Sequence, residues 1–255
     1  MNKVLPVINN NMSDNAVFKE IDQLQREINS RRPLSLYQLG QIKEYFRIGL
    51  TYSSNALEGN SLTESETKVV LEEGIAIGGK RLTEHLEAIG HSDAYNFLYT
   101  CIKSNTIIEA DIQQLHWLFY YRINEEQAGV YRSVNAYITG SKYPLPSADQ
   151  LAVLMENLIL QLNEVKSSVY PIIFAALMHK EFVFIYPFID GNGRVARLLM
   201  NLALLQAGYT IAIIPPIMRS TYIGALEKAH ENDHDFIMFI AHMVKETQKD
   251  YLRLF

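Results

Sequence analysis

Six residues that open an apolar helical segment have the types and the spacing to bind phosphate. They are Asp190, Gly191, Asn192, Gly193, Arg194 and Arg197. The two glycines let the main chain expose successive N–H groups at a helix N-terminus, where the helix dipole already favours an anion. Arg194 and Arg197 are three positions apart and share one helix face, so two guanidinium groups can bind neighbouring phosphates. Asp190 is a hard oxygen ligand suited to Mg²⁺. The pattern predicts a site for a nucleoside di- or triphosphate with magnesium.

Three known phosphate or metal motifs compete for this stretch. The spacing of a Walker A loop is absent, and so are the alternating acids of a calcium loop. Gly191, Gly193 and Ala196 fit the dinucleotide pattern GxGxxG/A. That fold needs repeated strands and an acid about twenty residues later, whereas this chain continues into Pro215-Pro216. A plain surface turn with solvated arginines is the remaining alternative.

The longer stretch HKEFVFIYPFIDGNGRVAR, from His179 to Arg197, resembles the signature HPFxDGNGRxxR of Fic-domain (Fido) proteins. These are mostly protein adenylyltransferases, which move AMP from ATP to a hydroxyl group of a target protein. The residues 129–132, GVYR, look like the segment that leads into the family's target-docking flap. The residues 54–59, SNALEG, match the inhibitory motif [ST]xxxE[GN], here N-terminal to the core. The resemblance covers roughly residues 45–245.

The resemblance implies roles for the phosphate-binding residues. Asp190 would hold Mg²⁺. Asn192 and the amides around Gly191 and Gly193 would hold the α- and β-phosphates. Arg194 would pair with the β-phosphate, so that Asn192 and Arg194 stand at positions that the family uses in catalysis.

The resemblance also implies an inhibitory contact and an adenine pocket. Arg197 would pair with the γ-phosphate, and Glu58 would reach Arg197 from the inhibitory helix, whose motif begins at Ser54. Because a carboxylate and a phosphate compete for one guanidinium group, this pair would be an off-switch. Tyr222 and His230 fall where family members line the adenine pocket.

Tyr186 stands where the family has the histidine that acts as general base. A phenol with a pKa near 10 is deprotonated in roughly one molecule in a thousand at pH 7, and general-base help is worth on the order of 10²–10⁴ in rate. His179 lies seven residues earlier, about 10 Å along a helix axis, so we expect it in the core or in support of the site. Three interpretations follow: a degenerate member that binds nucleotide without transfer, a slow transferase in which Arg194 lowers the pKa of Tyr186, or an engineered knockout.

Two classes of function therefore stay open. The first is an enzyme that transfers AMP to Ser, Thr or Tyr hydroxyl groups of a protein and is restrained by Glu58. The second is a nucleotide-dependent interaction module whose flap docks a partner without modifying it. A third, minor option is hydrolytic removal of AMP, with Glu58 orienting the water.

The elements that position these residues are mostly helical. Apolar periodicity and capping signals predict ten helices. They cover residues 15–30, 35–59, 63–71, 83–104, 109–122, 147–164, 169–185, 192–207, 219–230 and 234–252. The segment 135–147, NAYITGSKYPLPS, alternates around Gly140 and predicts a β-hairpin. A lone hairpin is barely stable alone, so it is expected to pack down or to hold a target segment by strand addition.

We therefore expect a mainly α fold: a helical Fic-type core bundle with one β-hairpin flap and an N-terminal helical extension. The extension would span residues 1–44, the inhibitory helix region 45–82, and the core 83–255 with its flap at 134–146.

Composition limits the setting in which the chain works. A net charge of −5 argues against broad electrostatic binding of nucleic acid. The single cysteine, Cys101, excludes an intrachain disulfide framework and fits a reducing compartment. The stretch 1–15 lacks the apolar core of a signal peptide, and the most apolar stretch, 198–218, is interrupted by Asn201 and by two prolines. We expect a cytoplasmic protein without a membrane or nucleic-acid partner. Its N-terminal helices could pack on the core or form a homo-oligomer with a second copy.

Overall fold

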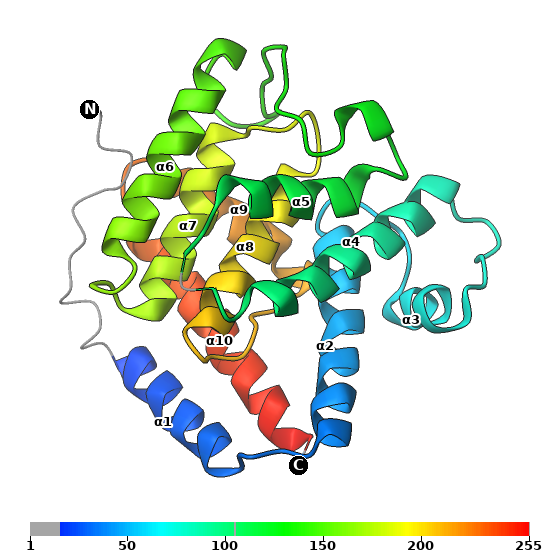
Figure 1. Ribbon diagram of the computed structural model, residues 1–255, viewed down its shortest axis with the longest axis vertical. Helices are drawn as coiled ribbons and strands as arrows, with labels where there is room; N and C mark the ends of the chain where they lie inside the picture. The colour runs from blue at the N-terminus through cyan, green and yellow to red at the C-terminus, as the bar shows by residue number, and fades with distance from the viewer. Residues whose placement is uncertain (1–15, 105, 255) are drawn as a thin grey trace.

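The computed structural model describes residues 16–104 and 106–254, which form ten α-helices and no β-strand (Figure 1). The helices are α1 (Ala16–Ser30), α2 (Leu36–Ala56), α3 (Glu64–Glu73), α4 (Leu82–Cys101), α5 (Glu109–Tyr120), α6 (Leu151–Val165), α7 (Pro171–Ile185), α8 (Asn192–Gln206), α9 (Arg219–Lys228) and α10 (His234–Arg253). The ten helices predicted from the sequence are present, with ends shifted by a few residues. The stretch 1–15, where no signal peptide is expected, lies outside the described residues.

Helices α7 and α8 form the centre of the bundle, and α4, α5, α6 and α10 surround them (Figure 1). Nearly every side chain of α7 is buried, because this helix is apolar on all faces and is covered on all of them. Pro171 at the first position of α7 supplies a preset φ where no hydrogen-bonded N–H is needed. The connection from α7 to α8 is the glycine-rich stretch, so the candidate site sits on the two most central helices.

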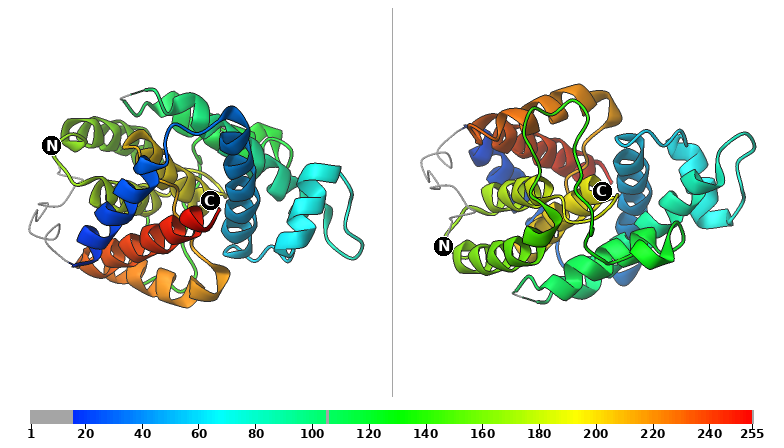
Figure 2. Two further views of the ribbon diagram at one scale, coloured as in Figure 1. Left: turned by 90° about the horizontal axis from the view of Figure 1, so that it is seen from below. Right: turned by 90° about the horizontal axis from the view of Figure 1, so that it is seen from above.

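Helix α1, which lies far from the candidate site in the sequence, packs along α10 (Figure 2, left). Its apolar face, with Phe18 and Ile21 fully buried, joins the same core cluster as α7 and α8. The amide of Gln25 donates to the carbonyl of Gly208 at 3.1 Å and ties α1 to the end of α8. Helix α1 of the predicted extension is thus packed onto the core, whereas residues 35–41 are exposed; a domain boundary at residue 44 stays a prediction.

The capping signals read from the sequence shape the helix ends. Thr63 and Glu66 exchange both bonds of a capping box at the start of α3. Ser147 and Gln150 form a second one, which opens a short 3₁₀ turn before α6 rather than α6 itself. Gly59, at φ +94°, reverses the chain just after α2. The turn after α2 is therefore held in a defined position.

The predicted β-hairpin at 134–146 is wrong, since no strand is found there among the described residues. A turn does form, closed by the N–H of Ser141 and the carbonyl of Ile138 at 3.1 Å. The two arms do not pair, and Pro144 and Pro146 have no N–H to give to a ladder. We call this segment the flap. It crosses the ends of α7 and α8 and reaches α9 as an irregular loop (Figure 2, right).

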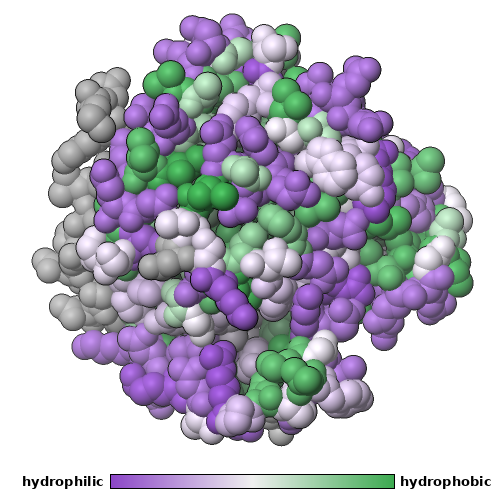
Figure 3. Space-filling view, in the orientation of Figure 1, coloured by the Kyte–Doolittle hydropathy of each residue, from purple (hydrophilic) through white to green (hydrophobic). Residues whose placement is uncertain are grey.

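Hydrophilic side chains cover most of the face seen in Figure 3, and apolar ones gather in separate patches, one of them near the ends of α2 and α10. Within the described ranges, none of the helices combines the length and the apolar character that crossing a bilayer requires.

Candidate active site

The turn between α7 and α8 is closed by one buried side chain. The Asn192 amide donates to the carbonyl of Phe188 at 2.8 Å, and its oxygen accepts the Phe188 N–H at 2.9 Å. At 1% exposure, Asn192 is fully buried in this turn, where it also hydrogen-bonds the Tyr186 side chain. Just before the turn, Tyr186 ends α7 at φ 52° and ψ 59°, the one non-glycine residue with positive φ among those described. The connection is therefore a tightly determined structure, not a loose surface turn.

Aromatic side chains of α5 support this turn from below. Gly191, at φ +76°, lies so close to Phe119 that a Cβ atom would come within 2.8 Å of the ring. His116 stacks on Phe188 at 3.8 Å. Its Nδ1 accepts the N–H of Gly129 at 2.8 Å, so the proton sits on Nε2, which donates to the carbonyl of Asp190 at 3.1 Å. Burial lowers the pKa of His116 to about 4, which keeps the ring neutral.

Sequence reasoning missed His116 and Phe119. They lie on a separate helix, and neither their type nor their spacing distinguishes them from core residues. Their role in supporting the turn appears only when α5 is packed beneath it.

The predicted pair of Glu58 and Arg197 is formed, at 2.8 Å from Oε1 to Nη2. Arg197 is 1% exposed, and it also donates from Nε to the hydroxyl of Ser54 at 2.9 Å and from Nη2 to the Ser54 carbonyl at 2.8 Å. Burial alone would raise the pKa of Glu58, but Arg197 and Arg194 outweigh it and lower the pKa below its usual value. The carboxylate is thus held ionised against the guanidinium group.

Glu58 also occupies the first turn of α8. A Cβ atom on Gly193 would come 2.3 Å from Glu58 Oε1. Only glycine at this position leaves room for the carboxylate over the helix N-terminus. The acid therefore lies where the dipole and the free N–H groups of α8 favour an anion.

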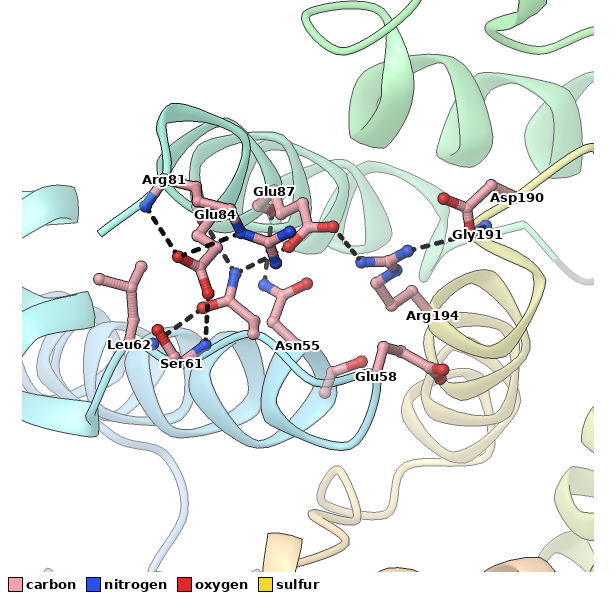
Figure 4. A network of polar contacts seen from close by, with 12 residues as sticks. Asn55, Glu58, Ser61, Leu62, Arg81, Glu84, Glu87, Asp190, Gly191 and Arg194 are labelled. Atoms are coloured by element: carbon pink, nitrogen blue, oxygen red, sulfur yellow. Dashed lines mark hydrogen bonds and ion pairs between the residues drawn. The ribbon is translucent and has the colours of Figure 1, made fainter. Parts of the chain in front are cut away.

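Arg194 is held by carboxylates on two sides. Its guanidinium group donates to Glu87 at 2.9 Å and to Asp190 at 3.2 Å, and it lies 4.4 Å from the centre of the Phe119 ring. Glu87, on α4, also accepts from the Asn60 amide at 2.8 Å, two residues beyond Glu58 in the chain. Figure 4 shows Glu87 between Arg194 and this turn after α2. Glu87 is a third site residue, after His116 and Phe119, that the sequence did not indicate.

Asp190 fits the predicted role of metal ligand. Its side chain is 54% exposed at the mouth of the site, while one oxygen accepts from Arg194 and from the Gly191 N–H at 2.6 Å. In residues 16–104 and 106–254 no group of three or more histidine, cysteine or acidic side chains is arranged to hold a metal. One carboxylate together with substrate phosphates is a usual way for proteins to bind Mg²⁺.

Tyr222 and His179 lie behind Arg197, and both are fully buried. The Tyr222 hydroxyl is 2.8 Å from His179 Nε2 and accepts from Arg197 Nη1 at 3.4 Å. Burial, reinforced by Arg197, lowers the pKa of His179 to about 3. The expectation that His179 belongs to the core, and is no substitute base, agrees with this placement.

A cavity of about 270 Å³ connects these residues with the flap. Its lining includes Glu58, Tyr186, Gly193, Tyr222, Tyr143 and His230. The His230 ring is stacked between Phe184 at 3.6 Å and Tyr143 of the flap at 3.8 Å. The structure thus brings Tyr222 and His230 to one cavity, next to the first turn of α8.

The expectation that Arg194 leaves Tyr186 with a lowered pKa is wrong, because the pKa is raised overall. Burial raises the pKa of this phenol, and the charges of Glu58 and Asp190 raise it further. A hydrogen bond from Asn192 and the charge of Arg194 act in the opposite direction but are outweighed. The Tyr186 phenol is therefore deprotonated even less often at neutral pH than free tyrosine.

Comparison with known proteins agrees with this geometry. The Fic/DOC family model matches residues 106–204. Protein adenylyltransferase Fic of Drosophila willistoni is 39% identical over 204 residues, 79% of this chain and 41% of the relative, so the chain spans about two fifths of that relative's length. Fic-1 from C. elegans (aa134–508) is 27% identical with a TM-score of 0.86, over 95% of this chain and 72% of that one.

Two more distant structures share the fold alone. BepC from Bartonella tribocorum, solved with bound AMPPNP, is 18% identical over 68% of this chain and 90% of that one, with a TM-score of 0.50. IbpAFic2 covalently tethered to Cdc42 is 16% identical over 92% of this chain and 81% of that one, with a TM-score of 0.51. Taken together, the family model, the curated relative and the Fic-1 structure identify the chain as a Fic/DOC-domain protein related to the protein adenylyltransferase Fic.

Proposed function

We propose that this protein binds ATP with Mg²⁺ at the start of α8, as an adenylyltransferase-type protein that Glu58 restrains. The observation that carries the proposal is the contact of Glu58 with Arg197 at 2.8 Å, with the carboxylate packed against Gly193. A carboxylate in that place competes with a terminal phosphate for the same guanidinium group and the same helix N-terminus. Displacing Glu58 would open the site.

The surrounding residues support a nucleotide in the open state. Arg197 would bind the γ-phosphate and Arg194 the β-phosphate, with the main-chain N–H groups at Gly191 and Gly193 nearby. Asp190 would hold Mg²⁺, which neutralises charge on the phosphates that it bridges. The adenine would enter the cavity lined by Tyr222 and His230. The distant relative BepC was solved with bound AMPPNP, an ATP analogue.

Transfer of AMP would place a target hydroxyl oxygen against the α-phosphorus of ATP. The new O–P bond forms as the bond to the leaving pyrophosphate breaks, and the hydroxyl proton must pass to a base. Tyr186 stands at that position, and the raised pKa of its phenol keeps it protonated at neutral pH, so the form that could accept the proton is scarce. We therefore expect transfer by this chain to be slow, by a factor on the order of 10²–10⁴ relative to one with a working base.

The flap would dock the target protein. It is irregular, and Tyr137 at its surface is 86% exposed, so its main chain is accessible to an extended segment. IbpAFic2, tethered to Cdc42, is a distant relative with a protein partner. The raised pKa of Tyr186 also favours a second candidate function, a nucleotide-dependent module that docks a partner without modifying it.

ATP labelled on its α-phosphate tests these proposals, with Mg²⁺ present and label on the protein itself as the signal. Four chains are compared: the unaltered chain, Glu58→Gly, Tyr186→His, and both changes together. Label in the double variant but not in Glu58→Gly would show a transferase whose missing base is the whole defect. Label already in Glu58→Gly would show that Tyr186 permits transfer.

Nucleotide binding is measured in parallel by calorimetry on the same four chains. Magnesium-dependent ATP binding by Glu58→Gly, without label in any chain, would favour the interaction module. No ATP binding by Glu58→Gly would contradict the proposal altogether, because freeing Arg197 should expose its phosphate site. Release of AMP from a modified target would instead point to hydrolytic removal.

A further inference from the structure

Arg132 is a buried cation whose three side-chain nitrogens donate to three main-chain carbonyl groups. The side chain is among the largest fully buried ones, at 2% exposure. Nε donates to the carbonyl of Tyr186 at 2.9 Å, Nη1 to Val134 at 2.8 Å and Nη2 to Pro146 at 2.7 Å. Burying a guanidinium group is costly unless its donors are satisfied. Here they are satisfied by two separate parts of the candidate site.

Two of these acceptors are the two ends of the flap. Val134 begins it and Pro146 ends it, and no strand ladder joins its arms. One side chain therefore bridges both ends of the loop in place of a ladder, and the Asn135 side chain adds a second link, accepting the N–H of Ala148 at 3.1 Å. The tip is held separately, where Glu227 of α9 accepts from the hydroxyl of Ser141 at 2.9 Å and from the N–H of Lys142 at 3.1 Å.

The third acceptor belongs to the strained end of α7. Tyr186 is left-handed at φ 52°, a conformation that costs a non-glycine residue roughly 1–2 kcal/mol. Arg132 holds this point twice, since its own N–H donates to the carbonyl of Pro187 at 2.9 Å. The main chain at 186–187 and both ends of the flap thus share one anchor.

We propose that Arg132 is a positioning residue that holds the flap and residue 186 as one unit. This rests on the proposed function, in which a target segment lies along the flap and its hydroxyl group faces position 186. With a common anchor, any segment docked on the flap meets position 186 at a set distance. Loss of the anchor would misplace the hydroxyl group while leaving the phosphate site, which Asn192, His116 and Phe119 hold, in place.

Arg132→Lys is the test variant, because lysine keeps the charge and the aliphatic stem but not the three-way donor geometry. It is placed in the Glu58→Gly, Tyr186→His chain. Hydrogen exchange is measured at the amides of the flap and at Tyr186, while the Phe188 amide, which donates to Asn192, reports on the phosphate turn and should stay protected. We expect exchange to rise in the flap and at Tyr186 together, by roughly tenfold or more. Self-labelling by ATP should fall by on the order of 10²-fold, with ATP affinity changed less than about threefold.

The matched control is Glu227→Gln, which loosens the tip of the flap only. It should raise exchange in the flap and leave the Tyr186 and Phe188 amides unchanged. The proposal would be overturned if Arg132→Lys also raised exchange in the flap but left the Tyr186 amide unchanged. It would equally be overturned if ATP affinity fell as much as labelling did. Should the parent chain show no labelling, the proposed transfer fails, and exchange alone still decides whether Arg132 couples the two segments.

Discussion

The two walls of the candidate site are built in opposite ways. On the phosphate side, Asn192 closes the turn before α8. This turn packs on Phe119 and accepts a hydrogen bond from His116, and all three side chains are buried. On the target side, the flap has no paired strands. Arg132 holds it at its base, and Glu227 of α9 and Glu231 just after α9 hold it at its tip.

The difference teaches which wall is prepared before a ligand arrives. A phosphate group has one shape, and a rigid turn with fixed N–H groups and two aligned guanidinium groups binds it without reorganisation. A target segment varies, and a wall fixed at few points can adjust to it. We therefore expect changes on the phosphate side to alter stability and changes on the flap to alter local motion.

The largest effect is expected for Gly191→Ala. The added methyl group would collide with Phe119, which costs roughly 1–3 kcal/mol, and alanine at φ +76° adds roughly 1–2 kcal/mol. Urea unfolding should show the sum as a lower free energy of unfolding. Gly140→Ala in the flap is the matched control, since Gly140 has φ +91° and nothing within 4 Å of a Cβ atom. Equal losses in the two variants would remove the distinction between the walls.

Glu58→Ala should move stability and binding in opposite directions. A hydrogen bond to a charged group is worth about 1.5–3 kcal/mol, so removing the partner of buried Arg197 should lower the free energy of unfolding by about that much. The same change frees the guanidinium group, and ATP affinity should rise roughly tenfold or more. Chemical unfolding and calorimetry check the two halves. An unchanged ATP affinity would mean that the phosphate side of the site is not already arranged to bind phosphate once Glu58 is removed.

The restraint by Glu58 should not depend on pH near neutrality. The pKa of Glu58 is lowered by the folded structure, so its stabilising contribution is present above the unfolded value of 4.5 and is lost only as pH falls through the folded value. The ratio of ATP affinities between Glu58→Ala and the parent chain should therefore stay constant from about pH 6 to about pH 8. A ratio that shrinks across this range would place the titrating group elsewhere.

Glu87→Gln tests whether the phosphate wall extends to α4. Arg194 is 4% exposed, and losing the charge of Glu87 should lower the free energy of unfolding by about 1–3 kcal/mol. The matched control is Asp93→Asn. Asp93 lies on α4, as Glu87 does, and forms a more exposed pair with Arg122, so its loss should cost about 0–1 kcal/mol. Urea unfolding of both variants measures the contrast; similar losses would show that Arg194 does not depend on Glu87.

The smallest effect on stability, within about 0.5 kcal/mol, is expected for Glu227→Gln. This change weakens the contacts of Ser141 and Lys142 at the tip of the flap. Trypsin should then cut after exposed Lys142 several times faster, while the bond after buried Arg194 stays resistant. Faster cleavage at both bonds would mean that the two walls move together even at the tip.

Local patterns in the sequence determined the helices and their ends. Helical periodicity and capping boxes depend on residues three or four positions apart, so the boxes at Thr63 and Ser147 could be read directly. The phosphate-binding stretch was read in the same way. The pairing of Glu58 with Arg197 came from the family resemblance, and the structure contains that contact.

Tertiary packing decided the rest, because it depends on distances between residues far apart in the chain. Nothing in type or spacing separates Glu87 from Glu84 until α4 lies beside Arg194, and the same holds for Arg132 and the flap. The alternation in the flap predicted strands, but its polar groups bond to side chains instead: the Ser141 hydroxyl to Glu227 of α9, and the Val134 carbonyl to Arg132. The pKa of Tyr186 rises because burial and two carboxylates outweigh the Asn192 hydrogen bond and one guanidinium group, a balance that only the folded positions define.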